Sequence, residues 1–162
     1  MNELSPELTF LLWAVALTFI QLIISLLGAT QQHGLTTLAG NRENIGSSSG
    51  WAGRAQRAHR NMLENLVLFA ILVIVAHIAG ISNELTVLGA QLFFWGRLAY
   101  SLIYVVGIAW LRTAAFLVSI LGLILIFLSC SAAINLCSLL QTKIGSLIFL
   151  IDKIPHLDTV FL

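Results

Sequence analysis

Charged residues are scarce in this chain. Only 9% of its 162 residues are Asp, Glu, Lys or Arg, whereas 59% are hydrophobic. A soluble domain carries about 25% charged residues, which form its water-facing surface. The sequence therefore excludes an ordinary soluble protein. The net charge of +1 also lacks the positive excess that binding to nucleic acid requires, so we expect no nucleic-acid partner.

Cysteine and metal-ligand patterns are also nearly absent. The two cysteines, Cys130 and Cys137, are seven residues apart in one apolar run, and a helix holds such side chains too far apart for a disulfide. We therefore expect both to be small packing residues. The sequence has no group of cysteines and histidines with metal-ligand spacing and no glycine-rich phosphate loop. It predicts no bound metal.

What the chain does contain is long apolar runs. A helix needs about 20 mostly apolar residues to cross a bilayer, and four runs approach or exceed that length: Leu8 to Gly28, Met62 to Ile81, Leu85 to Trp110 and Ala114 to Leu140. Strands of a membrane barrel would be about half as long and strictly alternating. The sequence therefore predicts an all-α membrane protein, with a four-transmembrane-helix bundle over residues 1–140. Residues 141–162 are expected to form a short C-terminal interfacial tail, because the apolar stretch there is too short to span and Pro155 would end a helix.

The positions of the cations predict how the bundle is oriented. The N-terminal tail and the second connection, around Ser82, contain no Lys or Arg. The first and third connections are basic, with Arg42, Arg54, Arg57, Arg60 and Arg112 in or beside them. Basic connections stay on the cytoplasmic side of a membrane. Both termini are therefore expected on the non-cytoplasmic side, although Lys143 and Lys153 count weakly against this orientation.

Polar residues inside the apolar runs mark the candidate site. An ionisable side chain near the middle of a spanning helix costs about 2.5–3.5 kcal/mol, and such residues persist where they face a partner or a water-filled cavity. The second predicted helix has polar residues at positions i, i+3, i+4 and i+7, on one face: Arg57, Arg60, Asn61 and Glu64. The third has Arg97, Tyr100 and Tyr104, at i, i+3 and i+7. Together these faces predict a cationic, hydrogen-bonding cavity that opens toward the cytoplasm.

The depths of Glu64 and Arg97 in the membrane indicate an ion pair. With a rise of about 1.5 Å per residue, Glu64 lies roughly 15 Å and Arg97 roughly 20 Å from the cytoplasmic ends of their helices. The two helices run antiparallel, so the side chains are close in depth. We therefore expect a structural ion pair between Glu64 and Arg97.

Several motifs in these segments resemble one family of membrane proteins. Arg57-Ala58-x-x-Asn61-x-x-Glu64, followed by an apolar run, looks like the signature of the MAPEG family, the membrane-associated proteins in eicosanoid and glutathione metabolism. Gly40-Asn41-Arg42, Trp51-Ala52-Gly53-Arg54 and Arg97-x-x-Tyr100-x-x-x-Tyr104 resemble its bacterial members. The resemblance covers about residues 8 to 137. It implies a left-handed four-helix bundle that assembles as a homotrimer, in the inner or plasma membrane of a bacterium.

The resemblance also implies an activity and roles for the polar residues. Enzymes of this family bind glutathione, as a co-substrate, between neighbouring subunits and attack lipophilic electrophiles or peroxides from the bilayer. The implied function is that of a membrane-embedded glutathione transferase or peroxidase. The residues that would bind glutathione are Arg57, Arg60, Asn61, Glu64, Tyr100 and Tyr104, and Arg97 would orient Glu64.

Arg112 matches the family's catalytic arginine, which is credited with stabilising the glutathione thiolate. A thiol with a pKa of about 8.5 is only a few per cent ionised at pH 7, and a nearby guanidinium lowers that pKa by about 1 to 2. The chain departs from the family's eicosanoid synthases at Phe116, where prostaglandin E synthases have a tyrosine, and at Gln31, Gln32 and His33, where an arginine is expected. These differences argue against a specific eicosanoid synthase and leave a general transferase or peroxidase.

Each candidate also has a purely structural interpretation. The arginines could set the topology, Glu64 with Arg97 could be a structural pair alone, and the tyrosines could be packing aromatics. For the whole protein, the alternatives are a non-catalytic lipid-binding scaffold of the same fold and a small transporter. Arginines around Glu64 would repel a transported cation. A groove for lipid alone would need none of the polar residues Arg60, Asn61, Tyr104 and Arg112.

Overall fold

The computed structural model describes residues 4–40, 46 and 48–152, and of residues 109 and 147–152 it describes the backbone alone. Asn41 and Arg42, which contribute to the motif and to the predicted orientation, lie outside the described residues. Lys153 and Pro155 lie outside them as well.

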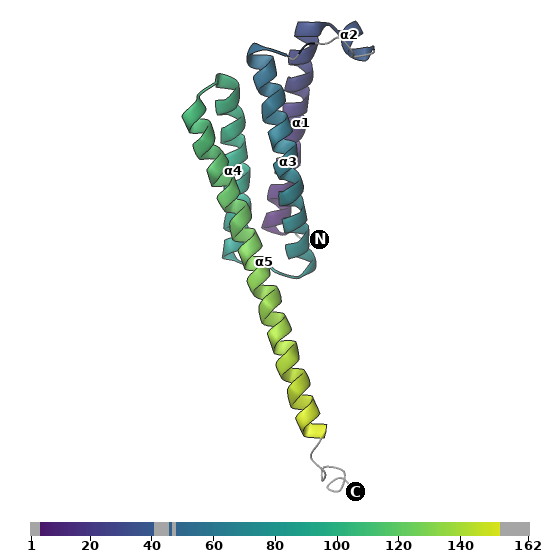
Figure 1. Ribbon diagram of the computed structural model, residues 1–162, viewed down its shortest axis with the longest axis vertical. Helices are drawn as coiled ribbons and strands as arrows, with labels where there is room; N and C mark the ends of the chain where they lie inside the picture. The colour runs from purple at the N-terminus through teal and green to yellow at the C-terminus, as the bar shows by residue number, and fades with distance from the viewer. Residues whose placement is uncertain (1–3, 41–45, 47, 153–162) are drawn as a thin grey trace.

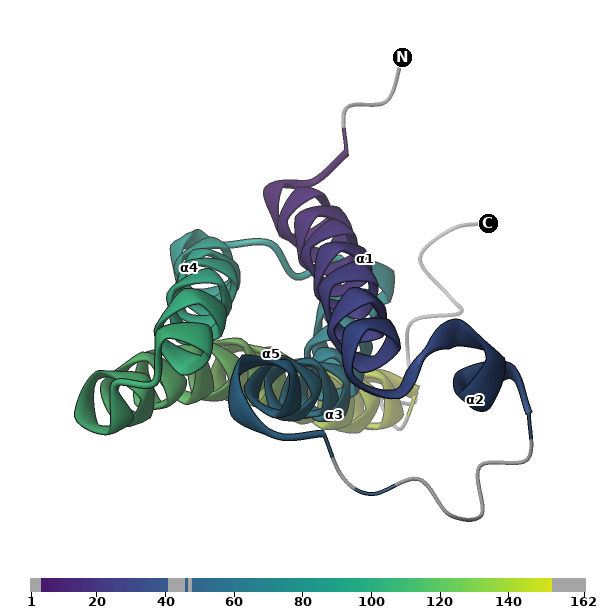
Figure 2. The ribbon, with the colours of Figure 1, turned by 90° about the horizontal axis from the view of Figure 1, so that it is seen from above.

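The described chain forms one short and four long helices. α1 spans Pro6–His33, α3 spans Gly50–Ile78, α4 spans Glu84–Val106 and α5 spans Ala109–Asp152, and the short α2, Leu35–Ala39, lies between α1 and α3. The closest pairs are α1 with α3 and α4 with α5, and both α1 and α3 also contact α4 (Figure 2). Figure 1 shows the start of α3 and the α4–α5 connection at one end of the bundle, and the α3–α4 connection at the other.

Three helical segments within the described residues are long and apolar enough to cross a membrane: Pro6–His33, Gly50–Ile78 and Trp110–Ser146. The prediction of an all-helical membrane protein is therefore confirmed. α4, predicted as a further span, is 23 residues long but is not among the three. Gln91, Arg97 and two tyrosines interrupt its apolar residues.

Local sequence accounts for the helix ends. α1 begins at Pro6, and the hydroxyl of Ser5 accepts a hydrogen bond from the backbone N of Leu8 at 3.4 Å. α4 ends at Val106 and is capped by Gly107, whose φ of +98° lies in the left-handed region that favours glycine. The predicted third span, which ran to Trp110, is therefore too long. Trp110 instead belongs to the first turn of α5.

The last helix is longer than the apolar run Ala114 to Leu140 that was predicted to span the membrane. α5 continues to Asp152 and projects well beyond the other helices (Figure 1). No proline interrupts it, and the hydroxyls of Ser138, Thr142 and Ser146 donate to carbonyl oxygens of the preceding turn. These bonds let polar side chains remain within a continuous helix. The interfacial position of residues 141–162 stays a prediction.

Close contacts of α4 with its neighbours position its polar residues. A Cβ on Gly122 would lie 2.5 Å from the carbonyl oxygen of Gly89, and a Cβ on Gly89 would lie 2.7 Å from that of Gly122. Only residues without a side chain allow α4 and α5 to approach so closely. On the α3 side, Phe93 of α4 stacks on Phe69 with 4.0 Å between ring centroids. These contacts hold α4 between α3 and α5.

Candidate functional site

A pocket between α3, α4 and α5 brings together four of the predicted site residues. It has a volume of about 240 Å³ and is lined by Asn61, Tyr100, Tyr104, Arg112, Thr113 and Phe116. Tyr104 is near the end of α4, and Arg112 is in the first turn of α5. The pocket therefore lies toward the end of the bundle where α4 and α5 connect (Figure 1).

Tyr104 receives contacts from two arginines on different helices. The Nε of Arg57, on α3, donates a hydrogen bond of 3.2 Å to the Tyr104 hydroxyl. The guanidinium carbon of Arg112, on α5, lies 4.7 Å from the centroid of the Tyr104 ring, within the range of a cation–π interaction. The ring of Tyr100 lies 5.4 Å from the same ring. Tyr104 thus links Arg57 to Arg112 beside the pocket.

Arg97 lies directly behind the pocket wall and is fully buried. Its Nη1 donates a hydrogen bond of 2.6 Å to Oδ1 of Asn61, and the rings of Phe93, Tyr100 and Phe116 surround its guanidinium at 5.3–5.7 Å. Its Nε and Nη2 have no hydrogen-bond partner within the described residues. A positive charge is therefore held next to three residues that line the pocket.

The predicted ion pair between Glu64 and Arg97 does not form in the part of the chain that the structure describes. Glu64 is exposed, and Asn61 takes the contact with Arg97 instead. The rotation of α3 explains the difference. At 3.6 residues per turn, Asn61 lies about 60° nearer than Glu64 to the buried face of the helix, which is marked by Ala58 and Met62. Equal depth did not ensure that the two charges face each other.

The remaining residues of the α3 stripe lie on its exposed side. Arg57, Arg60 and Glu64 are all exposed, and Arg60 and Glu64 make no hydrogen bond or ion pair within the described residues. Four predicted site residues thus meet in the pocket: Asn61, Tyr100, Tyr104 and Arg112. Arg57 contacts Tyr104 beside the pocket, whereas Arg60 and Glu64 lie outside it.

Two pocket residues, Thr113 and Phe116, were not predicted as site residues. Phe116 is one turn after Arg112, and its ring centroid lies 6.3 Å from that of Tyr100. The i, i+4 spacing from Arg112 is the signal that would have identified it. Arg54, which belongs to the Trp51-Ala52-Gly53-Arg54 motif and was also interpreted as a possible topology signal, donates from Nε to the carbonyl oxygen of Val105 at 3.0 Å. It holds the start of α3 against the end of α4.

Comparison with known proteins gives the family. The sequence profile of the MAPEG family matches residues 10–132, which is more than half of the chain. The match contains every residue that lines the pocket and ends within α5. A comparison with curated proteins found no match. The resemblance seen in the sequence is confirmed: with its membrane-spanning helices, the chain is an integral membrane protein of the MAPEG family.

Proposed function

We propose that this protein is a membrane-embedded glutathione transferase or peroxidase that acts on a lipophilic electrophile or hydroperoxide. The observation that carries the proposal is the arrangement at Tyr104. Arg57 and Arg112 approach this residue from different helices, beside a pocket that also contains Asn61 and Tyr100. Membership of a family that acts in glutathione and eicosanoid metabolism supports the choice of glutathione as co-substrate.

The charges around the pocket suit this tripeptide. At neutral pH, glutathione carries two carboxylates, one ammonium group and a thiol. The region supplies five cations and one acid: Arg54, Arg57, Arg60, Arg97 and Arg112, with Glu64. We assign the backbone and carboxylates of glutathione to Arg57, Arg60, Asn61, Tyr100 and Tyr104. Glu64 then receives the ammonium group.

Arg112 is assigned the catalytic role. A positive charge beside the glutathione sulfur favours the thiolate, which is the nucleophilic form. The Arg112 side chain is half-buried and rests on the Tyr104 ring, which restrains its position at the pocket. Arg97, buried behind the wall, adds to the positive potential that a thiolate would experience.

One thiolate serves both reactions. With an electrophile, the sulfur forms a bond to carbon, and the leaving group departs with its electron pair. With a hydroperoxide, the sulfur attacks the terminal oxygen, the O–O bond breaks, and the alkoxide takes a proton to become an alcohol. The glutathione sulfenic acid then condenses with a second glutathione to give the disulfide and water.

The size of the pocket favours a site that is shared between subunits. Its volume of about 240 Å³ falls below the range of about 300–1,000 Å³ of typical ligand pockets. Arg60 and Glu64, on the exposed side of α3, lie outside it. We propose a homotrimer in which a neighbouring subunit covers this side of α3 and completes the glutathione site.

We further propose that α4 is a fourth transmembrane span. Its 23 residues make a helix about 35 Å long, enough for a hydrocarbon core of about 30 Å. Its charged residue, Arg97, is buried against α3 and α5 and need not face lipid. The pocket would then open to the cytoplasm, and both termini would lie on the non-cytoplasmic side of a bacterial plasma membrane.

A thiolate measurement on detergent-purified protein tests the proposed function. Bound glutathione should show the ultraviolet absorbance of a thiolate at neutral pH. Arg112→Ala should abolish this absorbance and slow the conjugation of a generic hydrophobic electrophile by about 10- to 100-fold. Arg60→Ala should instead weaken glutathione binding, measured by calorimetry. Lys143→Ala, which removes an exposed cation far along α5, is the matched control and should change neither quantity.

The same experiment separates an enzyme from its main alternative. A non-catalytic lipid-binding scaffold has no reason to ionise a thiol. Glutathione bound to the wild-type protein without thiolate absorbance, and without conjugation, would contradict the proposed function and indicate the scaffold.

A further inference from the structure

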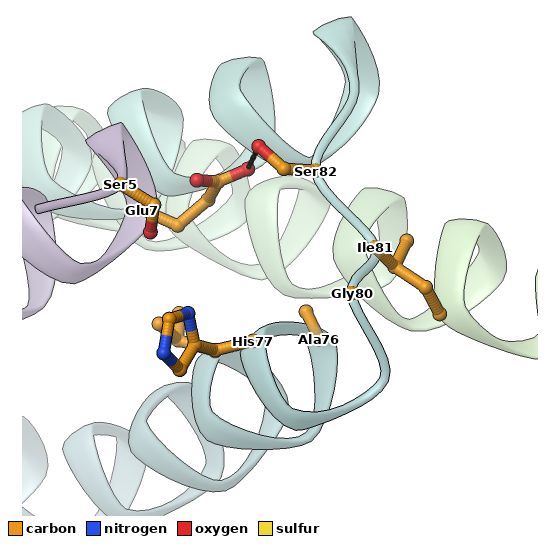
Figure 3. Close-up of a pocket in the computed structure, with 8 residues that line it drawn as sticks. Ser5, Glu7, Ala76, His77, Gly80, Ile81 and Ser82 are labelled. Atoms are coloured by element: carbon orange, nitrogen blue, oxygen red, sulfur yellow. Dashed lines mark hydrogen bonds between the residues drawn. The ribbon is translucent and has the colours of Figure 1, made fainter. Parts of the chain in front are cut away.

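A second pocket lies near the opposite end of the bundle from Arg112. It has a volume of about 230 Å³ and lies between the start of α1, the end of α3 and the connection to α4. Figure 3 shows the Glu7 carboxylate and Ser82 on one side and the His77 ring across from them. Part of the wall is apolar and includes Val73 and Ala76. No residue assigned to glutathione contributes to this pocket.

Glu7 is held rigidly at the edge of this pocket. Its side chain is only 3% exposed. Its Oε1 accepts hydrogen bonds from the hydroxyls of Thr86 and Ser82, at 2.6 and 2.9 Å. Its Oε2 is also buried, but it has no hydrogen-bond partner among the described residues. Two hydroxyls thus fix the carboxylate through one oxygen, and the other oxygen meets no donor at hydrogen-bonding geometry among the described residues.

The carboxylate also lacks a countercharge. Neither Lys nor Arg is among the described residues that line the pocket, and Glu7 forms no ion pair in the described part of the chain. Buried charges in proteins are normally paired, and buried polar atoms are normally hydrogen-bonded, because both lose their hydration. A cationic ligand that donates a hydrogen bond to Oε2 would satisfy both requirements.

The other lining residues favour an organic cation over a metal ion. Ca²⁺ and Mg²⁺ need about six or more oxygen ligands, whereas the polar side chains in this pocket are those of Ser5, Glu7, His77 and Ser82. A primary ammonium group needs acceptors for only three N–H groups. Oε2 of Glu7, a ring nitrogen of His77 and the hydroxyl of Ser5 can supply them. The apolar wall suits a short alkyl stem.

We propose that this pocket binds a primary ammonium group on a short aliphatic stem, with Glu7 as its countercharge. The proposal is independent of the glutathione site. The pocket lies where α1 begins and α3 ends, near the level at which a spanning helix reaches the lipid headgroups. The ammonium therefore has two sources, the headgroup of phosphatidylethanolamine and a small free amine.

Calorimetry on the detergent-purified full chain tests the recognition. Ethylammonium chloride should bind saturably, whereas tetramethylammonium chloride, which has no N–H donor, should not bind. Glu7→Gln keeps an oxygen that accepts from Thr86 and Ser82 but removes the charge, so it should weaken ethylammonium binding at least about tenfold. Glu84→Gln is the matched control. It removes an exposed carboxylate at the same end of the bundle, outside the pocket, and should leave binding unchanged.

Two further measurements complete the test. His77→Leu changes an exposed side chain, so the fold should tolerate it, and it should weaken ethylammonium binding several-fold even if Glu7→Gln fails to fold. Native mass spectrometry with phosphatidylethanolamine and phosphatidylcholine identifies the source. If the wild-type protein retains phosphatidylethanolamine selectively, and Glu7→Gln or His77→Leu loses it, the ammonium group comes from the lipid headgroup. If only ethylammonium binds, the natural ligand is a small free amine. Failure of both probes to bind the wild type, or binding unaffected by these variants, would overturn the proposal.

Discussion

Arg97 on α4 donates a hydrogen bond of 2.6 Å to Asn61 on α3, and this is the only hydrogen bond of its guanidinium within the described residues. Because Arg97 is fully buried, the partner on α3 matters for stability as well as for the shape of the pocket. Asn61 therefore lines the pocket, and its hydrogen bond also offsets part of the free energy that burial of the Arg97 cation costs.

Replacement of Asn61 should destabilise the fold more than replacement of Glu64. Asn61→Leu leaves the buried guanidinium without its hydrogen bond, which costs about 1.5–3 kcal/mol. Glu64→Gln changes an exposed residue and should alter the free energy of unfolding by less than about 0.5 kcal/mol. Denaturant unfolding in detergent measures both. A larger loss in Glu64→Gln would show that Glu64 meets a buried cation in the assembled protein after all.

Substitutions at Tyr104 should separate binding from catalysis. Tyr104→Phe removes the acceptor of the Arg57 hydrogen bond but keeps the ring beneath Arg112. The KM for glutathione should rise about fivefold, for the loss of about 1 kcal/mol, with kcat nearly unchanged. Tyr104→Leu also removes the ring and should lower kcat. Identical kinetic constants for the two variants would contradict a role for the ring in positioning Arg112.

The close approach of α4 and α5 should be sensitive to a single methyl group. Gly122→Ala would place a Cβ 2.5 Å from the carbonyl oxygen of Gly89, and the helices must separate at a cost of about 1–3 kcal/mol. Because Tyr104 and Arg112 lie on these two helices, glutathione binding should weaken as well. Gly145→Ala, on the same helix with nothing within 4 Å of the added Cβ, is the control and should be neutral or stabilising. Equal stability of the two variants would mean that the helices are looser than described.

Labelling of single cysteines should establish the orientation. In a chain with Cys130 and Cys137 replaced by alanine, Ser49→Cys should react with an impermeant maleimide only after the inner face is made accessible. Glu84→Cys, exposed at the other end of the bundle, should react from outside. The reverse pattern would place the Arg112 pocket on the outer face and contradict a site supplied with cytoplasmic glutathione.

The sequence predicted the helices and most members of the site because each depends on spacing along one helix. Apolar runs marked the spans, and the intervals from Arg57 to Asn61 and from Tyr100 to Tyr104 marked faces that meet at the pocket. Which residue of a face touches the neighbouring helix depends on the rotation of both helices. For this reason Arg97 contacts Asn61 and not Glu64, the residue predicted from depth alone.

Other features depend on contacts between distant segments. Glu7 has the position of an ordinary acid in the first turn of a helix, and its burial depends on Thr86 and Ser82, more than seventy residues later. The sequence pattern contains no signal for that contact. The length of α5 is a different case, because hydropathy shows where an apolar run ends and not where its helix ends. The hydroxyls of Ser138 and Thr142 bond back to the helix, which continues past Leu140.

The length of α5 has a consequence for the bilayer itself. Its 44 residues make a helix about 66 Å long, whereas a membrane with its headgroups is about 40–45 Å thick. Fitting the straight helix within the hydrocarbon core would require a tilt of more than about 60°, beyond the observed range of about 0–40°. Even at a tilt of about 40°, a straight α5 therefore extends beyond the hydrocarbon core by about 20 Å in total. Leu136, Leu139 and Leu140 of this helix are exposed, and contact of such side chains with water costs free energy. The stability of the protein should therefore depend on the thickness of the membrane that surrounds it.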